Sequence, residues 1–365
     1  MMHTICWAMT QHDIDHRSAA LEEAADLLRR GELVAFPTET VYGLGADARN
    51  GDAVSKIYAA KGRPSDNPLI VHLASADQVD ELVVAVSDTE RRLMRALWPG
   101  ALTLILPCRP GAVDARVTAG LPTVAVRVPD HPLARRLIAA SGCPIAAPSA
   151  NRSGRPSPTT AQHVLDDMDG RIAGVVDGGA TGIGLESTVA QVSADGRRIH
   201  VLRPGGVTAA ELAAAAPGAE VVEAGTLELH AGEAPLSPGV KYTHYAPKGA
   251  LTLVSPRDGS ALTAAAHIRG ELRRLKALGE VTGVLCFSAE RASRYYADAA
   301  ADVVVVCGSE GAGVETIARE LYGALRAFDE AGATAMLAET VAEAGLGAAV
   351  MNRLRKAAGG NVVEI

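Results

Sequence analysis

Two short stretches of this chain carry side chains that suit the binding of anions. Lys61 and Arg63 lie at the predicted end of a helix, and Ser149 and Asn151 follow a short predicted strand. A lysine acts as a point charge on phosphate, whereas an arginine can bind two oxygens at once. Such groups fit a reaction that positions and neutralises phosphates without a protein nucleophile. Two solvated surface cations and a plain Ser/Asn turn are the alternatives.

Two further polar residues lie inside predicted strands. Side chains alternate between the faces of a strand, so His72 shares a face with Ile70, and Arg127 shares one with Thr123 and Ala125. A buried guanidinium is costly without a partner. Arg127 therefore needs either an anionic ligand, for which we favour a substrate carboxylate, or a structural salt bridge. A histidine in the position of His72 is either a ligand contact or a core group with its own hydrogen bond.

Several common catalytic motifs are absent from the sequence. It contains no G-x-x-x-x-G-K-[ST], so an ATP site here would not be a P-loop. No zinc-binding spacing of Cys and His and no G-x-S-x-G elbow occurs. The glycine-rich run 178–184 fits equally a flexible turn or a loop that contacts phosphate.

The elements that must position these residues alternate between helix and strand up to about residue 206. Apolar spacing and capping residues predict helices at 18–31, 52–60, 88–98 and 132–140, and strands at 33–36, 69–73, 102–106, 123–128, 144–147, 187–192 and 199–202. This alternation indicates an α/β domain. Its sheet need not be wholly parallel, because no helix separates strands 102–106 and 123–128.

The chain divides into four segments in this interpretation. A polar N-terminal extension covers 1–17, the first α/β domain covers 18–206, a long linker covers 207–248, and a second α/β domain covers 249–365. Strands at 251–254, 283–287 and 303–306 with helices at 314–328 and 346–358 predict a small Rossmann-like layer. The first of these strands is not followed by G-x-G-x-x-G, so no dinucleotide is inferred.

Composition narrows the class of protein. The 365 residues are 48% hydrophobic, enough for a large aliphatic core, and the net charge of −7 argues against a strong nucleic-acid footprint. The five cysteines form no C-x-x-C pair and are predicted to be small buried hydrophobic residues in a reducing compartment. No signal peptide or membrane span is recognised, so we expect a cytoplasmic protein.

Read in order, the motifs resemble those of the YrdC-like family. Thr-Glu-Thr-Val-Tyr-Gly-Leu-Gly at 38–45 is similar to the opening motif of that family, and Lys-Gly-Arg at 61–63 with Ser-Ala-Asn at 149–151 is similar to its K-x-R…S-x-N signature. The likeness covers roughly residues 18–206. The Ser-Pro-Gly…His-Tyr-Ala-Pro stretch at 237–247 and the tail resemble the longer, two-domain threonylcarbamoyl-AMP synthases.

The resemblance implies a fold and an activity. The fold would be α/β, with an N-terminal YrdC-like twisted mixed sheet, helices and a concave cleft, and a smaller Rossmann-like C-terminal domain. The activity would join L-threonine, bicarbonate and ATP into threonylcarbamoyl-AMP and pyrophosphate. A partner enzyme, the tRNA threonylcarbamoyl transferase, would then modify tRNA adenosine; direct contact with tRNA is only weakly supported by the charge balance. Mg²⁺ would arrive with ATP or pyrophosphate, because no acidic cluster for a metal is evident.

Site residues carry over by motif. The catalytic signature would be Lys61, Arg63, Ser149 and Asn151; the L-threonine contacts would be Thr40, His72, Arg127, Ala147 and Ser187; the ATP contacts would be Lys61, Arg63, Asn67, Thr123, Ser149, Asn151, Ser157, Arg203 and Tyr245. We also expect Tyr242 and Tyr245 of the linker to act as a lid that keeps water from a labile mixed anhydride. A packed linker with anchoring tyrosines is the alternative.

Three other functions are compatible with parts of the pattern. An RNA-binding module without catalysis would release no pyrophosphate. A carbamoyltransferase of the hydrogenase-maturation type would need zinc-finger cysteines that this chain lacks. A structural or regulatory protein would use the second domain to bind a partner, about which the sequence is silent.

Overall fold

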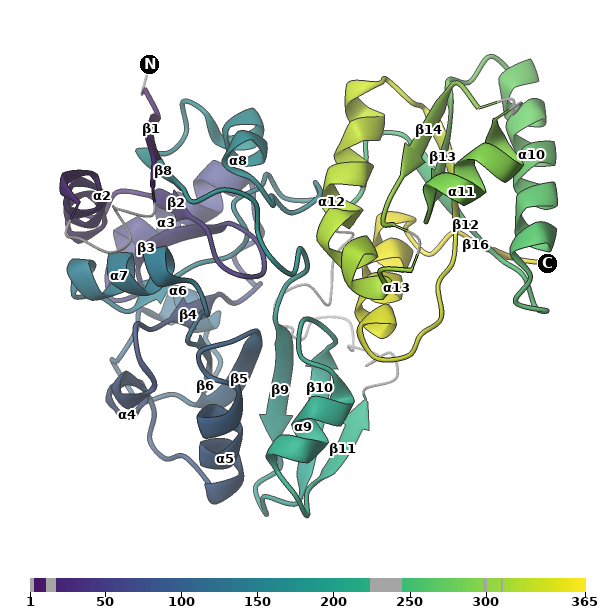
Figure 1. Ribbon diagram of the computed structural model, residues 1–365. Coiled ribbons are helices and arrows are strands. Elements are labelled where there is room, and N and C mark those ends of the chain that lie inside the picture. The colour runs from purple at the N-terminus through teal and green to yellow at the C-terminus, as the bar shows by residue number, and fades with distance from the viewer. Residues whose placement is uncertain (1–2, 11–17, 224–244, 298–300, 310) are drawn as a thin grey trace. The chain divides into compact units, whose positions relative to one another are not determined.

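The computed structural model describes residues 3–10, 18–223, 245–297, 301–309 and 311–365. The chain forms two compact units. The first comprises Met1–Ser153 and Ser157–Lys241, and the second comprises Gly154–Pro156 and Tyr242–Ile365 (Figure 1). The chain therefore leaves the first unit for three residues at 154–156 and returns to it.

A mixed sheet forms the centre of the first unit. Its strands are β1 (Ile5–Ala8), β2 (Val34–Phe36), β3 (Gly43–Asp47), β4 (Ile70–His72), β5 (Leu102–Pro107), β6 (Thr123–Arg127), β7 (Ile145–Ala146), β8 (Gly174–Asp177), β9 (Thr188–Val192), β10 (Arg198–Arg203) and β11 (Glu220–Glu223). They lie in the order β1-β8-β2-β3-β7-β4-β6-β5-β9-β10-β11. As expected, β5 and β6 pair antiparallel, whereas β4 and β6 pair parallel.

Helices connect these strands. They are α2 (Ala19–Arg29), α3 (Gly51–Lys61), the 3₁₀ turn η1 (Ala76–Gln78), α4 (Val79–Leu82), α5 (Asp88–Leu97), α6 (Ala115–Thr118), α7 (Pro132–Ser141), α8 (Ala161–Met168) and α9 (Ala209–Ala215). Local signals set their ends. Asn50 Oδ1 accepts the N–H groups of Asp52 and Ala53 at the start of α3, and Gly62 ends α3 with φ 62°, a conformation that favours glycine.

The sheet has a different cover on each face. On one face, buried side chains of α3, α5, α8 and α9 join the large core, together with Val71 of β4 and Val126 of β6. On the other face, α2 and α7 pack over β8, β2, β3 and β7. The remainder of this second face carries a small cluster formed by Ile70, Ile105, Ala125 and Val189. We call it the site face, because His72 and Arg127 lie on it.

The second unit contains a parallel sheet with helices on both sides (Figure 1). Its elements are β12 (Ala250–Ser255), α10 (Ala261–Ala277), β13 (Thr282–Cys286), α11 (Ala289–Arg291), the π-helix η2 (Ala292–Tyr296), β14 (Val303–Val306), α12 (Val314–Glu330), β15 (Ala335–Glu339), α13 (Leu346–Ala357) and β16 (Val362–Glu364). The strand order is β14-β13-β15-β12-β16, all parallel. The unit is of the doubly wound kind, with its first and fourth strands exchanged relative to the Rossmann order.

Two predicted segments prove more structured than their sequences indicated. Ile5–Ala8 of the N-terminal extension forms β1, parallel to β8. Residues 207–223 were assigned to the linker, but they form α9 and β11, and β11 pairs with β10. Both strands gain their hydrogen bonds from distant partners, which local sequence does not reveal. The remaining linker residues 224–244, including Tyr242, lie outside the described residues.

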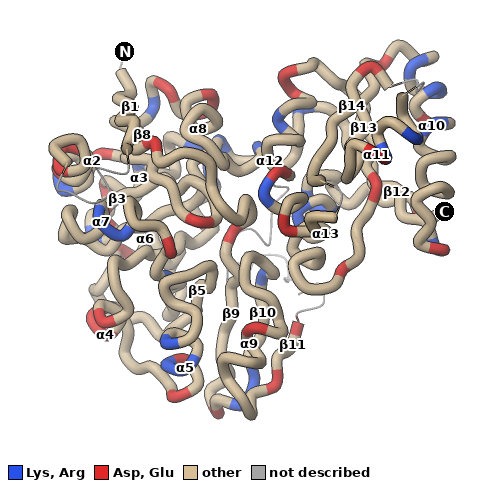
Figure 2. Tube along the Cα trace, in the orientation of Figure 1, with Lys and Arg blue, Asp and Glu red and all other residues tan. Residues whose placement is uncertain are grey.

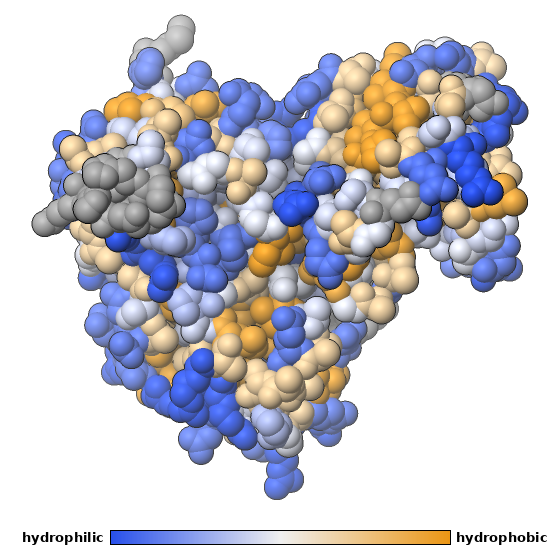
Figure 3. Space-filling view, viewed as in Figure 1, coloured by the Kyte–Doolittle hydropathy of each residue, from blue (hydrophilic) through white to orange (hydrophobic). Residues whose placement is uncertain are grey.

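Surface properties agree with the composition. Both signs of charge are interspersed along the described chain of each unit (Figure 2). Apolar side chains gather over β14, where Val304 and Val306 are exposed (Figure 3). Of the five cysteines, Cys143, Cys286 and Cys307 are buried, as predicted, whereas Cys6 is exposed and Cys108 is half-buried. Among the described helices, none has the length and apolar character needed to cross a bilayer.

Candidate active site

A row of buried polar residues crosses the site face on neighbouring strands. His72 ends β4 and pairs directly with Arg127 at the end of β6. Thr103 of β5 comes next, and its Oγ1 lies 2.7 Å from the Oγ of Ser187, which precedes β9. Arg203 ends β10 and donates from Nη2 to the Ser187 carbonyl over 2.8 Å. The sheet order thus brings together residues that lie far apart in sequence.

Arg127 already has an acidic partner in this row. Its Nη2 lies 2.6 Å from Oε2 of Glu39, and its Nη1 donates to Oγ1 of Thr40 over 2.9 Å. Neither carboxylate oxygen of Glu39 nor the Nε of Arg127 has a hydrogen-bond partner among the described residues. The ion pair is therefore close in space but poorly aligned for hydrogen bonding. The salt bridge that we regarded as the alternative exists, and the pair retains capacity for a ligand.

The turn that carries Glu39 and Thr40 is held rigidly. Thr38 Oγ1 lies 2.7 Å from Thr40 Oγ1 and donates to the Val41 carbonyl. From the glycine-rich run, the N–H groups of Ile183 and Gly184 donate to the carbonyls of residues 39 and 40. The run therefore braces this turn. Sequence reasoning missed Glu39, although it is the one carboxylate of the opening motif.

His72 is a neutral imidazole in this environment. Burial, followed by the charge of Arg127, lowers its pKa to about 3. Its Nδ1 lies 3.2 Å from the Ile70 carbonyl, and its ring meets the Phe36 ring edge to face at 6.1 Å. This hydrogen bond matches the alternative of a satisfied core histidine. His72 also lies beside Arg127 in the row of buried polar residues.

The two halves of the K-x-R…S-x-N signature meet directly. Lys61 Nζ donates to the carbonyls of Ser149 and Asn151, the latter over 2.5 Å. Ser149 Oγ donates to Asn151 Oδ1 over 2.5 Å, and the Ser153 N–H donates to the Lys61 carbonyl. Burial and then the nearby Arg63 hold the pKa of the Lys61 ammonium well below its usual value. Lys61 is therefore not a solvated surface cation; it fixes the turn that carries Ser149 and Asn151.

Asn67 is the strongest sign of a ligand at this end of the sheet. Its side chain is fully buried, yet neither Nδ2 nor Oδ1 has a hydrogen-bond partner among the described residues. Buried amides are nearly always paired. Arg63 lies beside it and donates from Nη2 to the Pro68 carbonyl and from Nε to the Asn67 carbonyl. A ligand that contacts Asn67 would supply the missing partners.

The other predicted residues of the first unit lie between or beside these clusters. Thr123 begins β6, at the opposite end of that strand from Arg127. Ala147 is buried next to β4, and its N–H donates to the Ile70 carbonyl. Ser157 Oγ donates to Oε1 of Glu186 over 2.6 Å. Glu186 is a second buried carboxylate that sequence reasoning missed.

The direction of β7 decides at which end of the neighbouring strands Ser149 lies. Ser149 follows β7, as its predicted position after a short strand indicates. β7 runs antiparallel to β4, so the end of β7 lies at the start of β4. The Ser149–Asn151 turn consequently lies on the same side as Asn67. His72 and Arg127 lie at the other end of β4 and β6.

Tyr245 is described within the second unit, where its ring lies 5.2 Å from that of Tyr322 and 5.5 Å from the guanidinium carbon of Arg353. Its backbone has φ 68°, which is unusual for a residue other than glycine. The structure therefore gives Tyr245 the anchoring position that we named as the alternative to a lid.

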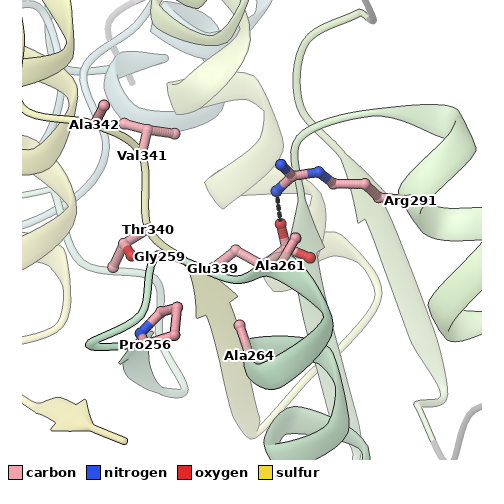
Figure 4. Close-up of a pocket in the computed structure, with 9 residues that line it drawn as sticks. All are labelled: Pro256, Gly259, Ala261, Ala264, Arg291, Glu339, Thr340, Val341 and Ala342. Atoms are coloured by element: carbon pink, nitrogen blue, oxygen red, sulfur yellow. Dashed lines mark hydrogen bonds and ion pairs between the residues drawn. The ribbon is translucent and has the colours of Figure 1, made fainter.

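A cavity of about 240 Å³ lies in the second unit, at the ends of the adjacent strands β12 and β15 (Figure 4). Loops after these strands line it, together with the start of α10. Arg291 Nη1 donates to Oε2 of the buried Glu339, and Tyr296 donates to Oε1. Asp258 accepts the N–H of Ser260, the N-cap residue of α10. The charges here are paired within the chain, so the cavity alone indicates no ligand.

Comparisons with known proteins cover both units. Residues 26–205 match the family described as "Telomere recombination", and residues 207–359 match "Threonylcarbamoyl-AMP synthase, C-terminal domain". The threonylcarbamoyl-AMP synthase of Bacillus subtilis is 53% identical over 94% of both chains. That of Pyrococcus abyssi is 44% identical over 94% of this chain and 95% of its own. The structure of P. abyssi Sua5 complexed with L-threonine is 40% identical, with a TM-score of 0.85, over 100% of this chain and 99% of that one.

Proposed function

The chain belongs to the threonylcarbamoyl-AMP synthase family, and from this membership we propose how its residues divide the work of the reaction. The enzyme is a nucleotidyltransferase that joins L-threonine, bicarbonate and ATP into threonylcarbamoyl-AMP and releases pyrophosphate. The product serves the threonylcarbamoyl modification of tRNA. The assignment of individual residues below is our proposal.

Two polar clusters lie at opposite ends of the same pair of strands, and this observation is the basis for assigning one to threonine and the other to ATP. Asn67 and Thr123 mark the start of β4 and β6, whereas His72 and Arg127 end them. A strand rises about 3.3 Å per residue, so Thr123 and Arg127 are separated by roughly 13 Å. That span accommodates an amino acid at one end and the phosphates and nucleoside of ATP at the other.

The end with Arg127 is the proposed threonine site. A guanidinium binds a carboxylate through two parallel hydrogen bonds, and Arg127 Nε has no partner among the described residues. The neutral ring of His72 adds no competing charge beside it. Thr40, Ala147 and Ser187 would complete the contacts, with the small Ala147 side chain leaving room for the substrate.

The end with Asn67 is the proposed ATP site. Arg63 supplies a guanidinium for phosphate, Asn67 an unsatisfied amide, and Ser149 a hydroxyl. Lys61 contributes charge and also holds the Ser149–Asn151 turn through two carbonyls. The remaining proposed ATP contacts are Thr123, Asn151, Ser157 and Arg203. Arg203 lies in the row with Ser187, so it would contact ATP from the threonine side.

This arrangement suits a reaction without a protein nucleophile. The threonine amine adds to the carbon of bicarbonate with loss of water, or to carbon dioxide with loss of a proton, and gives a carbamate. A carbamate oxygen then forms a bond to the α-phosphorus, and the bond from that phosphorus to pyrophosphate breaks. Positioning and charge neutralisation are the chief requirements of such a transfer. The buried cations at both ends supply them.

Mg²⁺ is proposed to be held chiefly by the phosphates. In the described part of the chain, no three His, Cys, Asp or Glu side chains converge. The hydroxyl and amide oxygens near Asn67 are hard ligands that suit Mg²⁺. A carboxylate, that of Glu186, accepts a hydrogen bond from Ser157, which is a proposed ATP contact. Bound with ATP, the ion would neutralise part of the phosphate charge.

We further propose that the product passes to a separate tRNA threonylcarbamoyl transferase and that the enzyme works in the cytoplasm, where tRNA is found. The mixed anhydride between carbamate and phosphate is labile, which favours direct delivery. Positive and negative residues are interspersed along the described chain (Figure 2), which gives no support to extensive tRNA contact.

The test is pyrophosphate release from ATP with and without L-threonine and bicarbonate. Release should require both, and Lys61→Ala and Arg127→Ala should abolish it. Arg91→Ala is the matched control, because Arg91 forms a half-exposed ion pair with Asp80 and should retain full activity. Absence of threonine-dependent release from the folded enzyme would refute the proposal, and no pyrophosphate release at all would favour a binding module.

A further inference from the structure

The loop that carries the proposed ATP contacts passes through the second unit. Ser149 and Asn151 precede the segment Gly154–Pro156, and Ser157 follows it. By its contacts this segment belongs to the second unit, although its neighbours on both sides belong to the first. The loop is fixed before the segment by Lys61 and after it by Glu186. The middle of the loop is fixed elsewhere.

One face of α12 holds this segment. Tyr322, Arg326 and Asp329 are spaced by four and three residues, so they lie on the same side of the helix. Arg326 Nη2 donates to the Pro156 carbonyl over 2.6 Å. Asp329 Oδ2 lies 4.0 Å from Nη2 of Arg155. Arg326 is buried despite its charge, which indicates a specific structural task.

The same helix face also holds the chain where it enters the second unit. Tyr245 packs on Tyr322, and the Lys248 N–H donates to Oδ1 of Asp329 over 2.7 Å. The Ala246 N–H donates to the Gly154 carbonyl over 2.9 Å. Two passages of the chain are thus fastened to each other and to α12.

We propose that the second unit is a positioning element for ATP binding, and that Arg326 is its central positioning residue. By holding Gly154–Pro156, α12 orders the loop that places Ser149, Asn151 and Ser157 before ATP arrives. Ordering a loop in advance removes an entropic cost from binding. The proposal rests on the assignment of this loop to ATP, and it gives the second unit a role in the reaction without contact with substrate.

The experiment measures KM for ATP and KM for L-threonine in full-length variants. Arg326→Ala should raise KM for ATP about tenfold, a loss of about 1.4 kcal/mol, and should leave KM for threonine within twofold. Arg326→Lys should recover most of the loss, because an ammonium can still donate to the Pro156 carbonyl. The control Arg319→Ala removes an exposed arginine of the same helix and should change neither constant.

A second variant distinguishes a loss of loop positioning from unfolding of the second unit. Insertion of two glycines between Pro156 and Ser157 leaves every α12 contact in place but uncouples the segment from Ser157. It should raise KM for ATP as Arg326→Ala does. Equal increases in both KM values, or an insertion variant with unchanged KM for ATP, would overturn the proposal. Threonine-dependent pyrophosphate release by the wild type separates either result from a failure of the proposed function.

Discussion

Replacement of Glu39 by glutamine should lower the free energy of unfolding, because it leaves Arg127 buried without a charged partner. Arg127 is 3% exposed, and its guanidinium lies 2.6 Å from the Glu39 carboxylate. Glu39→Gln removes the negative charge and keeps the shape of the side chain. Arg127 would then remain buried and charged, with Thr40 as a hydrogen-bond acceptor.

The expected loss follows from burial of an unpaired charge. Removing one partner of a buried ion pair costs about 3–5 kcal/mol. Thr40 still accepts a hydrogen bond from Arg127, and the amide oxygen of the glutamine stays beside the guanidinium, so we expect a loss of about 2–3 kcal/mol in the free energy of unfolding. The control Glu32→Gln breaks the half-exposed pair with Lys56 and should cost under about 1 kcal/mol.

Tryptophan fluorescence during urea unfolding reports the first unit alone, because Trp7 and Trp98 are the chain's two tryptophans and both lie there. The measurement is repeated with L-threonine and with L-threonine methyl ester. Threonine should stabilise Glu39→Gln more than wild type, because its carboxylate replaces the missing charge. The ester lacks that carboxylate, so it should not reduce the difference in unfolding free energy between wild type and Glu39→Gln.

Two results would refute this reasoning. A loss below about 1 kcal/mol would mean that Arg127 does not depend on Glu39 for its charge balance. If the ester reduces the difference in unfolding free energy between wild type and Glu39→Gln as much as threonine does, the threonine carboxylate does not bind at Arg127.

Three further predictions concern other parts of the site. His72→Asn should abolish a pH dependence of the free energy of unfolding, because the pKa of His72 is about 3 in the folded protein and about 6.5 in the unfolded chain. As pH falls through this window, the wild type should lose about 1.4 kcal/mol of unfolding free energy per pH unit relative to the variant, as measured by urea unfolding. Asn67→Leu should raise the unfolding free energy by about 1 kcal/mol, since it removes unsatisfied amide atoms, while KM for ATP rises more than tenfold; a stability loss would contradict this. Gly205→Ala should lower kcat/KM for threonine at least tenfold, because an added Cβ would lie 2.4 Å from backbone atoms of residues 186–188 and displace Ser187; unchanged kinetics would contradict it.

Local sequence signals predicted a large part of the fold. The helix from 18 to 31 appears as α2, and Gly62 ends α3 as expected. Strand alternation placed His72 and Arg127 on one face correctly, and the register pairs them. These features depend on neighbours in sequence or on the two-residue period of a strand.

Other features depend on partners that no local pattern names. The edge strand β11 exists through its pairing with β10, and the antiparallel direction of β7 decides which end of β4 receives Ser149. Glu39 was hidden because a carboxylate in a turn reads as a solvated group until Arg127 is known to face it. The segment Gly154–Pro156 reads as an ordinary turn, and only the contacts with α12 assign it to the second unit.

The strand order of the first unit also governs when the site can form during synthesis. Arg127 meets Thr40 across 87 residues, Lys61 meets Ser149 across 88, and Thr103 meets Ser187 across 84. Contacts this distant form late, after the chain between them has been made, and they slow folding. A nascent chain that ends before Ser187 therefore lacks part of the proposed threonine site, and one that ends before Arg203 lacks part of the proposed ATP site. L-threonine should consequently stabilise only chains that have emerged beyond Ser187, and ATP only chains that have emerged beyond Arg203, so the two proposed sites are completed in order as the chain is made.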